Sequence, residues 1–117
     1  MPGDIAFHNR TPRPDTMVVT VSGEIDMVTG SQLRDHLDAA CQGLPAGGQV
    51  VADLRSVSFL GCSGLNVLAA ANERIQRSGK HLRVVADRPA VLRPLQLTML
   101  DQKLPVDVTL RAALASR

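Results

Sequence analysis

The apolar run from Val50 to Leu54 constrains the fold of this chain more than any other stretch. It has the length of a strand and is almost continuous, which is typical of a strand covered on both faces. Small and polar residues follow it, and the pattern from Leu65 onward predicts a helix. The sequence therefore predicts a central strand, a short loop and a helix whose start presents hydroxyl and thiol groups beside unpaired backbone N–H groups.

Strands and helices alternate along the rest of the chain. The apolar and polar alternation from Met17 to Ser22 predicts a strand with one buried face. A helical stripe follows at Leu33, Leu37, Ala40 and Cys41. The expected strands cover 5–7, 17–22, 50–54, 81–86 and 104–106, and the expected helices run from 29 or 31 to the GLPAGG stretch, from about 62 to 78, from 89, and from 107 or 109. This order predicts an α/β fold with a mixed sheet of four or five strands, parallel except for an antiparallel hairpin at the start.

Glycine and proline set the expected boundaries of these elements. The stretch NRTPRPD, residues 9–15, is typical of a turn, and Gly23 is expected to end the second strand. Pro94 should kink or shorten the third helix, in which we expect Met99 to face the sheet.

The composition bounds the class of protein. With 117 residues the chain is expected to be one domain over 1–117, and an aromatic content of 2% without Trp or Tyr requires an aliphatic core. A net charge of +2 and few aromatic residues give no indication of nucleic-acid binding. Nothing resembles a signal peptide or a membrane span, so we expect a cytoplasmic protein. Its cysteines, Cys41 and Cys62, are expected to be free thiols at opposite ends of the sheet.

Positive charge gathers between Arg74 and Arg93, where only Asp87 opposes it. Two interpretations are open: a solvated face, or a docking site for an acidic partner. The basic residues are Arg74, Arg77, Lys80, Arg83, Arg88 and Arg93.

Three interpretations compete at the stretch from Gly61 to Leu65. Glycine and serine are common where a helix starts. A serine side chain can accept hydrogen bonds from the unpaired N–H groups of the first turn, and glycine allows unusual backbone dihedral angles. A cysteine or serine there can also be a nucleophile, here Cys62 or Ser63. The third interpretation is a regulatory surface that presents a serine to a partner.

Catalysis needs further groups that the sequence does not supply. A nucleophile elbow would need glycine at Leu65, and a phosphatase-like loop would need arginine at Leu68. The histidines, His8, His36 and His81, have no spacing that ties them to this stretch. No cofactor fingerprint or metal-ligand pattern is present, so we expect no cofactor and no metal.

The segment DLRSVSFLGCSGL resembles the signature of the STAS domain family, and in particular its stand-alone members, the bacterial anti-sigma factor antagonists. VSGEID upstream resembles the second strand of that family. The matching positions of the signature are Asp53, Leu54, Val57, Phe59, Leu60, Ser63, Gly64 and Leu65. Two positions differ, since Gly61 and Cys62 stand where the family has aspartate and serine.

This resemblance implies a small mixed sheet with flanking helices and a protein that is not an enzyme. It implies binding to an anti-sigma factor that is also a serine kinase, release of the sigma factor, and control by phosphorylation of Ser63, which a phosphatase reverses. No nucleic-acid or membrane partner is expected. The expected contact residues are Glu24, Asp26, Gly61, Cys62, Ser63, Gly64, Leu65 and Asn66.

Two other functions stay open at this point. One is a STAS-type accessory subunit of a transport or stress-signalling assembly that lacks a phosphorylation switch. The other is a small enzyme that depends on Cys62.

Overall fold

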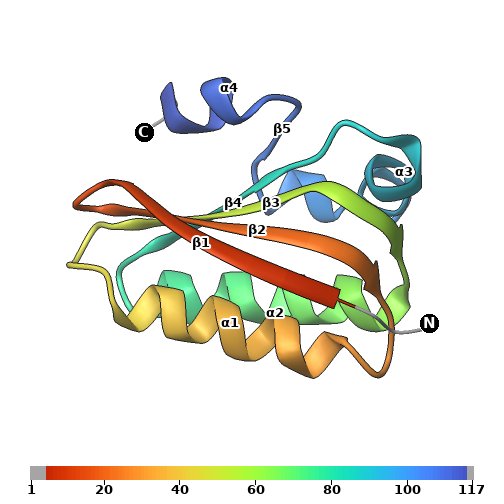
Figure 1. Cartoon of the computed structure of the whole chain (residues 1–117), viewed down its shortest axis with the longest axis horizontal. Helices are drawn as coiled ribbons and strands as arrows, with labels where there is room; N and C mark the ends of the chain where they lie inside the picture. Colours follow the sequence, from red (N-terminus) through yellow and green to blue (C-terminus); the bar gives the residue numbers. More distant parts are fainter. Residues whose placement is uncertain (1–4, 116–117) are drawn as a thin grey trace.

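The computed structural model describes residues 5–115, which form a mixed sheet with helices on both sides (Figure 1). In chain order the elements are β1 (Ile5–Arg13), β2 (Thr16–Ile25), α1 (Gly30–Gln42), β3 (Gln49–Leu60), α2 (Cys62–Arg77), β4 (His81–Val85), α3 (Pro89–Leu97), the 3₁₀ turn η1 (Leu100–Gln102), β5 (Val106–Asp107) and α4 (Leu110–Ala115).

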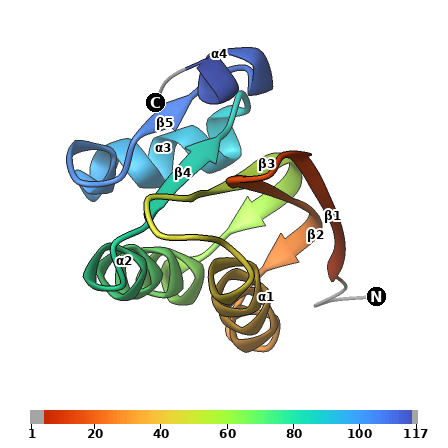
Figure 2. The ribbon, with the colours of Figure 1, turned by 90° about the vertical axis from the view of Figure 1, so that its left-hand side faces the viewer.

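The strands lie in the sheet in the order in which they occur in the chain, β1-β2-β3-β4-β5. β1 pairs antiparallel with β2, and every other pair is parallel. α1 and α2 cover one face, and Val91 and Leu95 of α3 pack into the same core cluster, while α4 lies on the other face (Figure 2). The predicted α/β fold, the hairpin at the start and the central place of β3 are confirmed.

The core is aliphatic and occupies both faces of the sheet. Val50, Ala52 and Leu54 of β3 pack into the main cluster with α1 and α2. Val51, between them, points to the other face and packs in a small cluster with Ala113 of α4. Burial on both sides explains why this strand is an uninterrupted apolar run rather than an alternating one.

The first three strands, β1, β2 and β3, are longer than predicted. The turn expected at 9–15 is confined to Pro14 and Asp15, because β1 continues to Arg13. β1 is an edge strand with mostly exposed side chains, where polar residues and proline are tolerated. Gly23 does not end β2; it has a φ of 107° and lies at a register shift between β2 and β3.

The short loop expected after Leu54 is also wrong, because β3 continues to Leu60. Its pairing with β4 ends at Asp53, whereas its pairing with β2 continues to Leu60. The second half of β3 therefore has a neighbour on one side only and carries exposed polar residues. It extends beyond β4 and leads directly into α2.

Met99 does not face the sheet as expected. α3 ends at Leu97, and Met99 follows in the left-handed conformation with φ 60° and an exposed side chain. Pro94 lies inside this helix, which continues beyond it to Leu97, so the expected kink or shortening stays a prediction.

The start of α2 packs closely on the ends of β2 and β3, and glycine is required for this approach. Gly64 is buried, and a Cβ atom at this position would lie 2.6 Å from both Ile25 Cγ2 and Leu60 Cδ1.

We predict that Gly64→Ala lowers the free energy of unfolding by about 1–3 kcal/mol through overpacking. Alanine normally stabilises a helix relative to glycine by up to about 1 kcal/mol, so a loss identifies the clash. The control is Gly43→Ala, whose Cβ would meet ordinary contacts at 3.7 Å and 3.8 Å and should change stability by less than about 0.5 kcal/mol. Urea denaturation measures both, and equal stability of the two variants would contradict this packing.

Candidate functional site

The site lies where β2 and β3 end and α2 begins. The backbone N–H of Gly61 donates a hydrogen bond to the carbonyl of Ile25, 2.9 Å away, which ties the start of α2 to the end of β2. Gly61 is the N-cap residue, and no side chain caps the helix. The first turn of α2 therefore presents its N–H groups without a side-chain partner and contains no acidic residue.

Ser63 lies in this first turn and is partly exposed. Its hydroxyl makes no hydrogen bond with any residue between 5 and 115. The interpretation as a plain helix start agrees with the glycine, since Gly61 is the N-cap residue, whereas Ser63 does not cap the helix. A hydroxyl that has no structural partner is free to react or to be modified.

The other predicted contact residues divide by burial. Cys62 and Asn66 are exposed and Gly61 is partly exposed, whereas Gly64 and Leu65 are buried. The two buried residues hold the helix against the core. We expect them to position the contact surface instead of touching a partner.

Glu24 lies near the end of β2, and Asp26 begins the connection from β2 to α1, beside the start of α2. The Asp26 carboxylate accepts hydrogen bonds from the backbone N–H groups of Val28 (2.9 Å) and Thr29 (3.0 Å). The Thr29 hydroxyl donates to the Glu24 carbonyl (2.7 Å) and accepts from the Asp26 N–H (2.9 Å). Thr29 thus holds the loop together. It is also the N-cap residue of α1, as one of the two predicted alternatives had it, although its side chain makes no capping hydrogen bond to the helix.

These hydrogen bonds stabilise the ionised form of the Asp26 carboxyl. The N–H of Thr29 is the main cause of a lowered pKa at the Asp26 carboxyl, and the N–H of Val28 adds to it. Partial desolvation opposes the shift. Asp26 is consequently an ionised group whose first role is to shape the loop.

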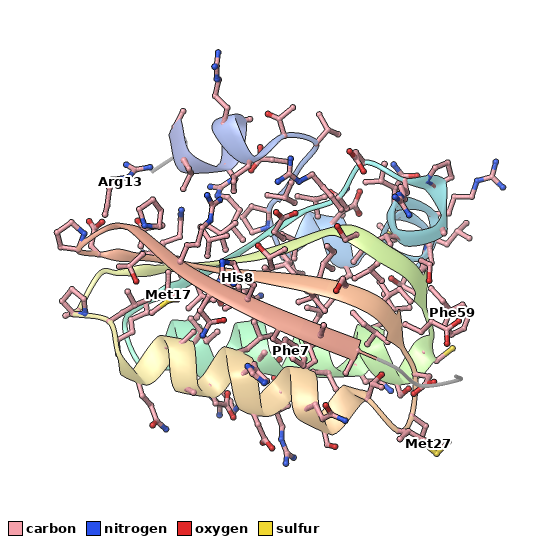
Figure 3. All side chains as sticks on the ribbon, in the orientation of Figure 1. Phe7, His8, Arg13, Met17, Met27 and Phe59 are labelled. Carbon is pink, nitrogen blue, oxygen red and sulfur yellow. The ribbon has the colours of Figure 1, made fainter. Side chains whose placement is uncertain are left out.

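Three large apolar side chains are exposed around this junction, and the sequence analysis missed them. Met27 is 85% exposed, Val28 72% and Phe59 50%. Figure 3 shows Met27 and Phe59 at the end of the molecule where β2 and β3 finish. Their signal is weak in sequence, because an apolar residue in a short connection looks the same whether it is buried or exposed.

We name the accessible part of this region the Ser63 surface. It comprises Glu24, Asp26, Met27, Val28, Phe59, Gly61, Cys62, Ser63 and Asn66.

The glycine at position 61 gives room to the ring of Phe59. A Cβ atom at Gly61 would lie 3.0 Å from Phe59 Cε2 and 3.3 Å from Phe59 Cζ. Any larger residue at this position would have to displace the ring. Gly61 therefore lets the Phe59 ring keep its position and adds no side chain of its own to the Ser63 surface.

The charged residues of the signature and of the basic stretch are largely used within the fold. Buried Asp53 accepts two hydrogen bonds from Arg55, from Nε at 2.8 Å and from Nη2 at 2.7 Å, and this pairing raises the pKa of Arg55. In the basic stretch, Arg74 pairs with Asp38, Arg83 pairs with Asp107 and Lys80 donates to the Cys41 carbonyl. These three residues are therefore engaged within the fold, and the two interpretations of the basic stretch stay predictions.

The cysteines are free, and Cys41 is buried whereas Cys62 is exposed. Cys41 Sγ lies 3.5 Å from the hydroxyl of Ser78, at the far end of α2 from Cys62. The 16 residues of that helix separate the thiols by about 24 Å, so the expectation of no disulfide is confirmed.

Histidines do not converge on the site. His8 lies exposed on β1, His81 lies exposed at the start of β4, and His36 stacks on Phe7 with the ring centroids 3.7 Å apart. Within residues 5–115 no group of histidine, cysteine or acidic side chains is arranged to hold a metal ion. In the same part of the chain, no helix has the length and hydropathy needed to cross a membrane.

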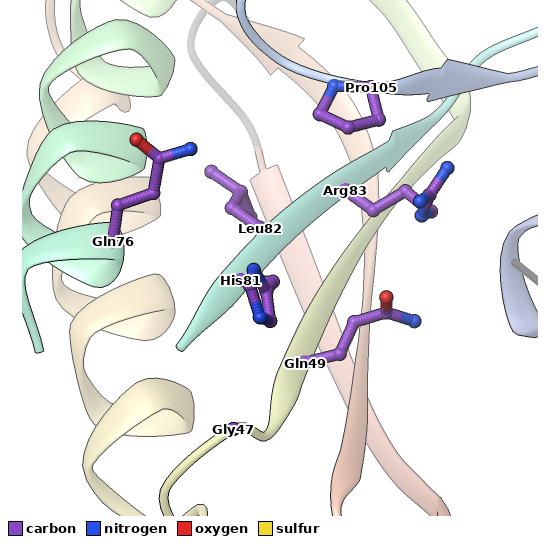
Figure 4. A pocket seen from close by; sticks show the side chains of 7 residues that line it. All are labelled: Gly47, Gln49, Gln76, His81, Leu82, Arg83 and Pro105. Carbon is purple, nitrogen blue, oxygen red and sulfur yellow. The ribbon is translucent and has the colours of Figure 1, made fainter. Parts of the chain in front are cut away.

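A polar pocket lies at the opposite end of the sheet, where β3 and β4 begin (Figure 4). Its lining includes Gln49, the first residue of β3, whereas the Ser63 surface follows the last residue of that strand. The pocket is therefore separate from the site. The lining residues are Gly47, Gln49, Gln76, His81, Leu82, Arg83 and Pro105.

Comparison with known proteins decides the family. The family model described as STAS domain matches residues 9–113. The chain belongs to the STAS domain family. It is 37% identical over 110 residues to the anti-sigma-F factor antagonist RsfB of Mycobacterium tuberculosis H37Rv, covering 94% of this chain and 84% of RsfB.

Solved structures agree with this assignment. An anti-sigma factor antagonist from Mycobacterium paratuberculosis is 38% identical, with a TM-score of 0.87 and coverage of 99% of this chain and 96% of that one. The unphosphorylated anti-sigma factor antagonist SpoIIAA shares the fold at 19% identity, with a TM-score of 0.73 over 93% of each chain.

Within the STAS family this chain falls in the group of anti-sigma factor antagonists. These are regulators without enzymatic activity, which confirms the expectation that the protein is not an enzyme. Cys62 as a catalytic nucleophile is therefore ruled out as the function of the site.

Because the pKa of Asp26 is lowered in the folded protein, we expect its contribution to the free energy of unfolding to depend on pH. A carboxylate with a lowered folded-state pKa stabilises the fold fully above the pKa of an unfolded aspartate, and this contribution is lost as the pH falls through the folded value. In the variant Asp26→Asn, the amide oxygen can accept the same hydrogen bonds, but the side chain does not titrate. We expect the stability difference between wild type and Asp26→Asn to shrink below about pH 4. Denaturation curves at pH 3 to 7 measure it, and a constant difference would argue against the carboxylate bonds.

Proposed function

We propose that this protein binds an anti-sigma factor through the Ser63 surface and thereby releases a sigma factor. The anti-sigma factor is also a serine kinase, and it phosphorylates Ser63 to end the interaction. A phosphatase restores binding. The protein acts in the cytoplasm, as part of a stress response.

One observation carries this proposal: the hydroxyl of Ser63 is accessible and has no hydrogen-bond partner in the part of the chain that the structure describes. Its modification removes no bond on which the fold depends. The exposed apolar side chains of Met27, Val28 and Phe59 support the surface as a docking site, because exposed apolar groups that gather in one place favour protein contacts.

The position of Ser63 determines how a phosphate would act. Phosphorylation adds about −1.5 to −2 charges, and the N-terminus of a helix favours anions by roughly 0.3–1 kcal/mol at exposed sites. The first turn of α2 has no acidic residue to repel the group, and Gly61 brings none beside it. We therefore expect the fold to tolerate the phosphate.

Loss of binding would arise at the partner surface. A hydrated dianion among Met27, Val28 and Phe59 would have to lose water when a partner covers these apolar side chains. Desolvation of an unpaired charge is costly, and this cost opposes association. The switch thus acts on the complex and leaves the free protein folded.

We predict that Ser63→Asp keeps the stability of the wild type within about 0.5 kcal/mol and weakens binding to the kinase-type anti-sigma factor at least about tenfold. Ser63→Ala should fold and bind like the wild type but accept no phosphate. Calorimetric titration with the purified anti-sigma factor measures affinity, and thermal denaturation measures stability.

The control variant is Ser56→Asp, which adds the same charge at an exposed serine of β3 outside the Ser63 surface. It should bind like the wild type. A markedly lower melting temperature of Ser63→Asp would overturn the proposed mechanism. Equal binding by all variants would favour an accessory STAS subunit without a phosphorylation switch.

A further inference from the structure

A groove opens beside the Ser63 surface, between α2 and the chain that follows α3. Figure 2 shows the two segments side by side, and the groove has a volume of about 590 Å³, within the range of roughly 300–1,000 Å³ found for binding clefts. One wall consists of Cys62, Leu65, Asn66, Ala69, Asn72 and Glu73 of α2, and the other of Thr98, Met99, Leu100, Gln102 and Lys103.

The groove runs along α2 from its first residue to Glu73, eleven residues later. At 1.5 Å per residue this length is about 16 Å, or three turns of a helix. The only charged lining residues are Glu73 and Lys103, and Glu73 lies at the end remote from Cys62. The part nearest Ser63 is therefore apolar or uncharged.

The wall opposite α2 is strained. Met99 is the only non-glycine residue between 5 and 115 with a positive φ, and its side chain is 65% exposed above the groove. Such a conformation is unfavourable for a residue with a side chain and is often found at functional sites. The exposed methionine is a flexible apolar side chain at the opening.

The wall is also held loosely across the groove. Asn72 is buried, and its Nδ2 reaches the Lys103 carbonyl only at 3.5 Å. Its Oδ1 is buried without a hydrogen-bond partner in the described residues. Leu100 and Leu104 anchor the segment to the core beneath. The rim of this wall can thus adjust while its base stays fixed.

We infer that this groove receives an amphipathic helical segment of the anti-sigma factor, about three turns long, with its apolar face against Met99 and Ala69. This inference rests on the proposed function. The groove begins at Cys62, so its occupant continues the contact made at Ser63, and its length and lack of charge suit an apolar helical stripe. A phosphate on Ser63 would stand at the entrance to the groove.

The test uses Met99→Gly, because stability and binding should change in opposite directions. Glycine relieves the positive φ of Met99, so the melting temperature should stay equal or rise. Loss of the side chain should weaken binding of the purified kinase-type anti-sigma factor at least about fivefold. A second variant, Ala69→Arg, fills the groove and should weaken binding at least about tenfold.

The matched control is Val108→Ala, which removes an exposed apolar side chain outside the groove and should leave affinity unchanged. If the wild type binds and both groove variants bind equally well, the groove inference is wrong while the proposed function stands. If the wild type does not bind any anti-sigma factor of the source organism, both are wrong. Folded groove variants with reduced affinity, beside an unchanged control, support the inference.

Discussion

The junction at Ile25, Leu60 and Gly64 fixes the position of everything functional in this molecule. The N–H of Gly61 is bound to the Ile25 carbonyl, and Gly64 allows α2 to approach both strand ends to within normal contact of their side chains. A larger residue at Gly64 would push the helix away from the sheet. Because the helix starts at this junction, its first turn and Ser63 are held at one end of a rigid core.

The distribution of charge around this junction explains the character of the surface. Asp53 and Arg55 neutralise one another within the fold, and Asp26 is occupied by the backbone N–H groups of its own loop. What remains accessible is an unpartnered hydroxyl among apolar side chains. Such a surface favours association in its neutral state and opposes it once a dianion is added. The uncharged part of the groove beside α2 continues this surface, so it also favours association in the absence of the phosphate.

The sequence was sufficient for the parts of the fold that repeat regularly and are buried. Val50 to Leu54 predicted the central strand because both of its faces are covered, and the stripe from Leu33 to Cys41 predicted α1 because one face is buried. The same criterion fails where burial is partial. β1 lies at an edge and the second half of β3 has one neighbour, so neither carries a clear apolar pattern.

The site was only partly predictable for a similar reason. A local motif located Ser63 and the start of α2, since a signature is read directly along the chain. Exposure depends on distant packing, so the sequence did not reveal that Met27, Val28 and Phe59 stay uncovered or that Met99 leaves the sheet.

The most direct test of the switch uses the protein phosphorylated on Ser63, compared by ¹⁵N NMR and calorimetric titration with the same sample after phosphatase treatment. Spectral changes confined to the Ser63 surface, with affinity for the anti-sigma factor lost and then restored, are the expected result. Unfolding of the phosphoprotein, or equal affinity before and after phosphatase, would contradict it.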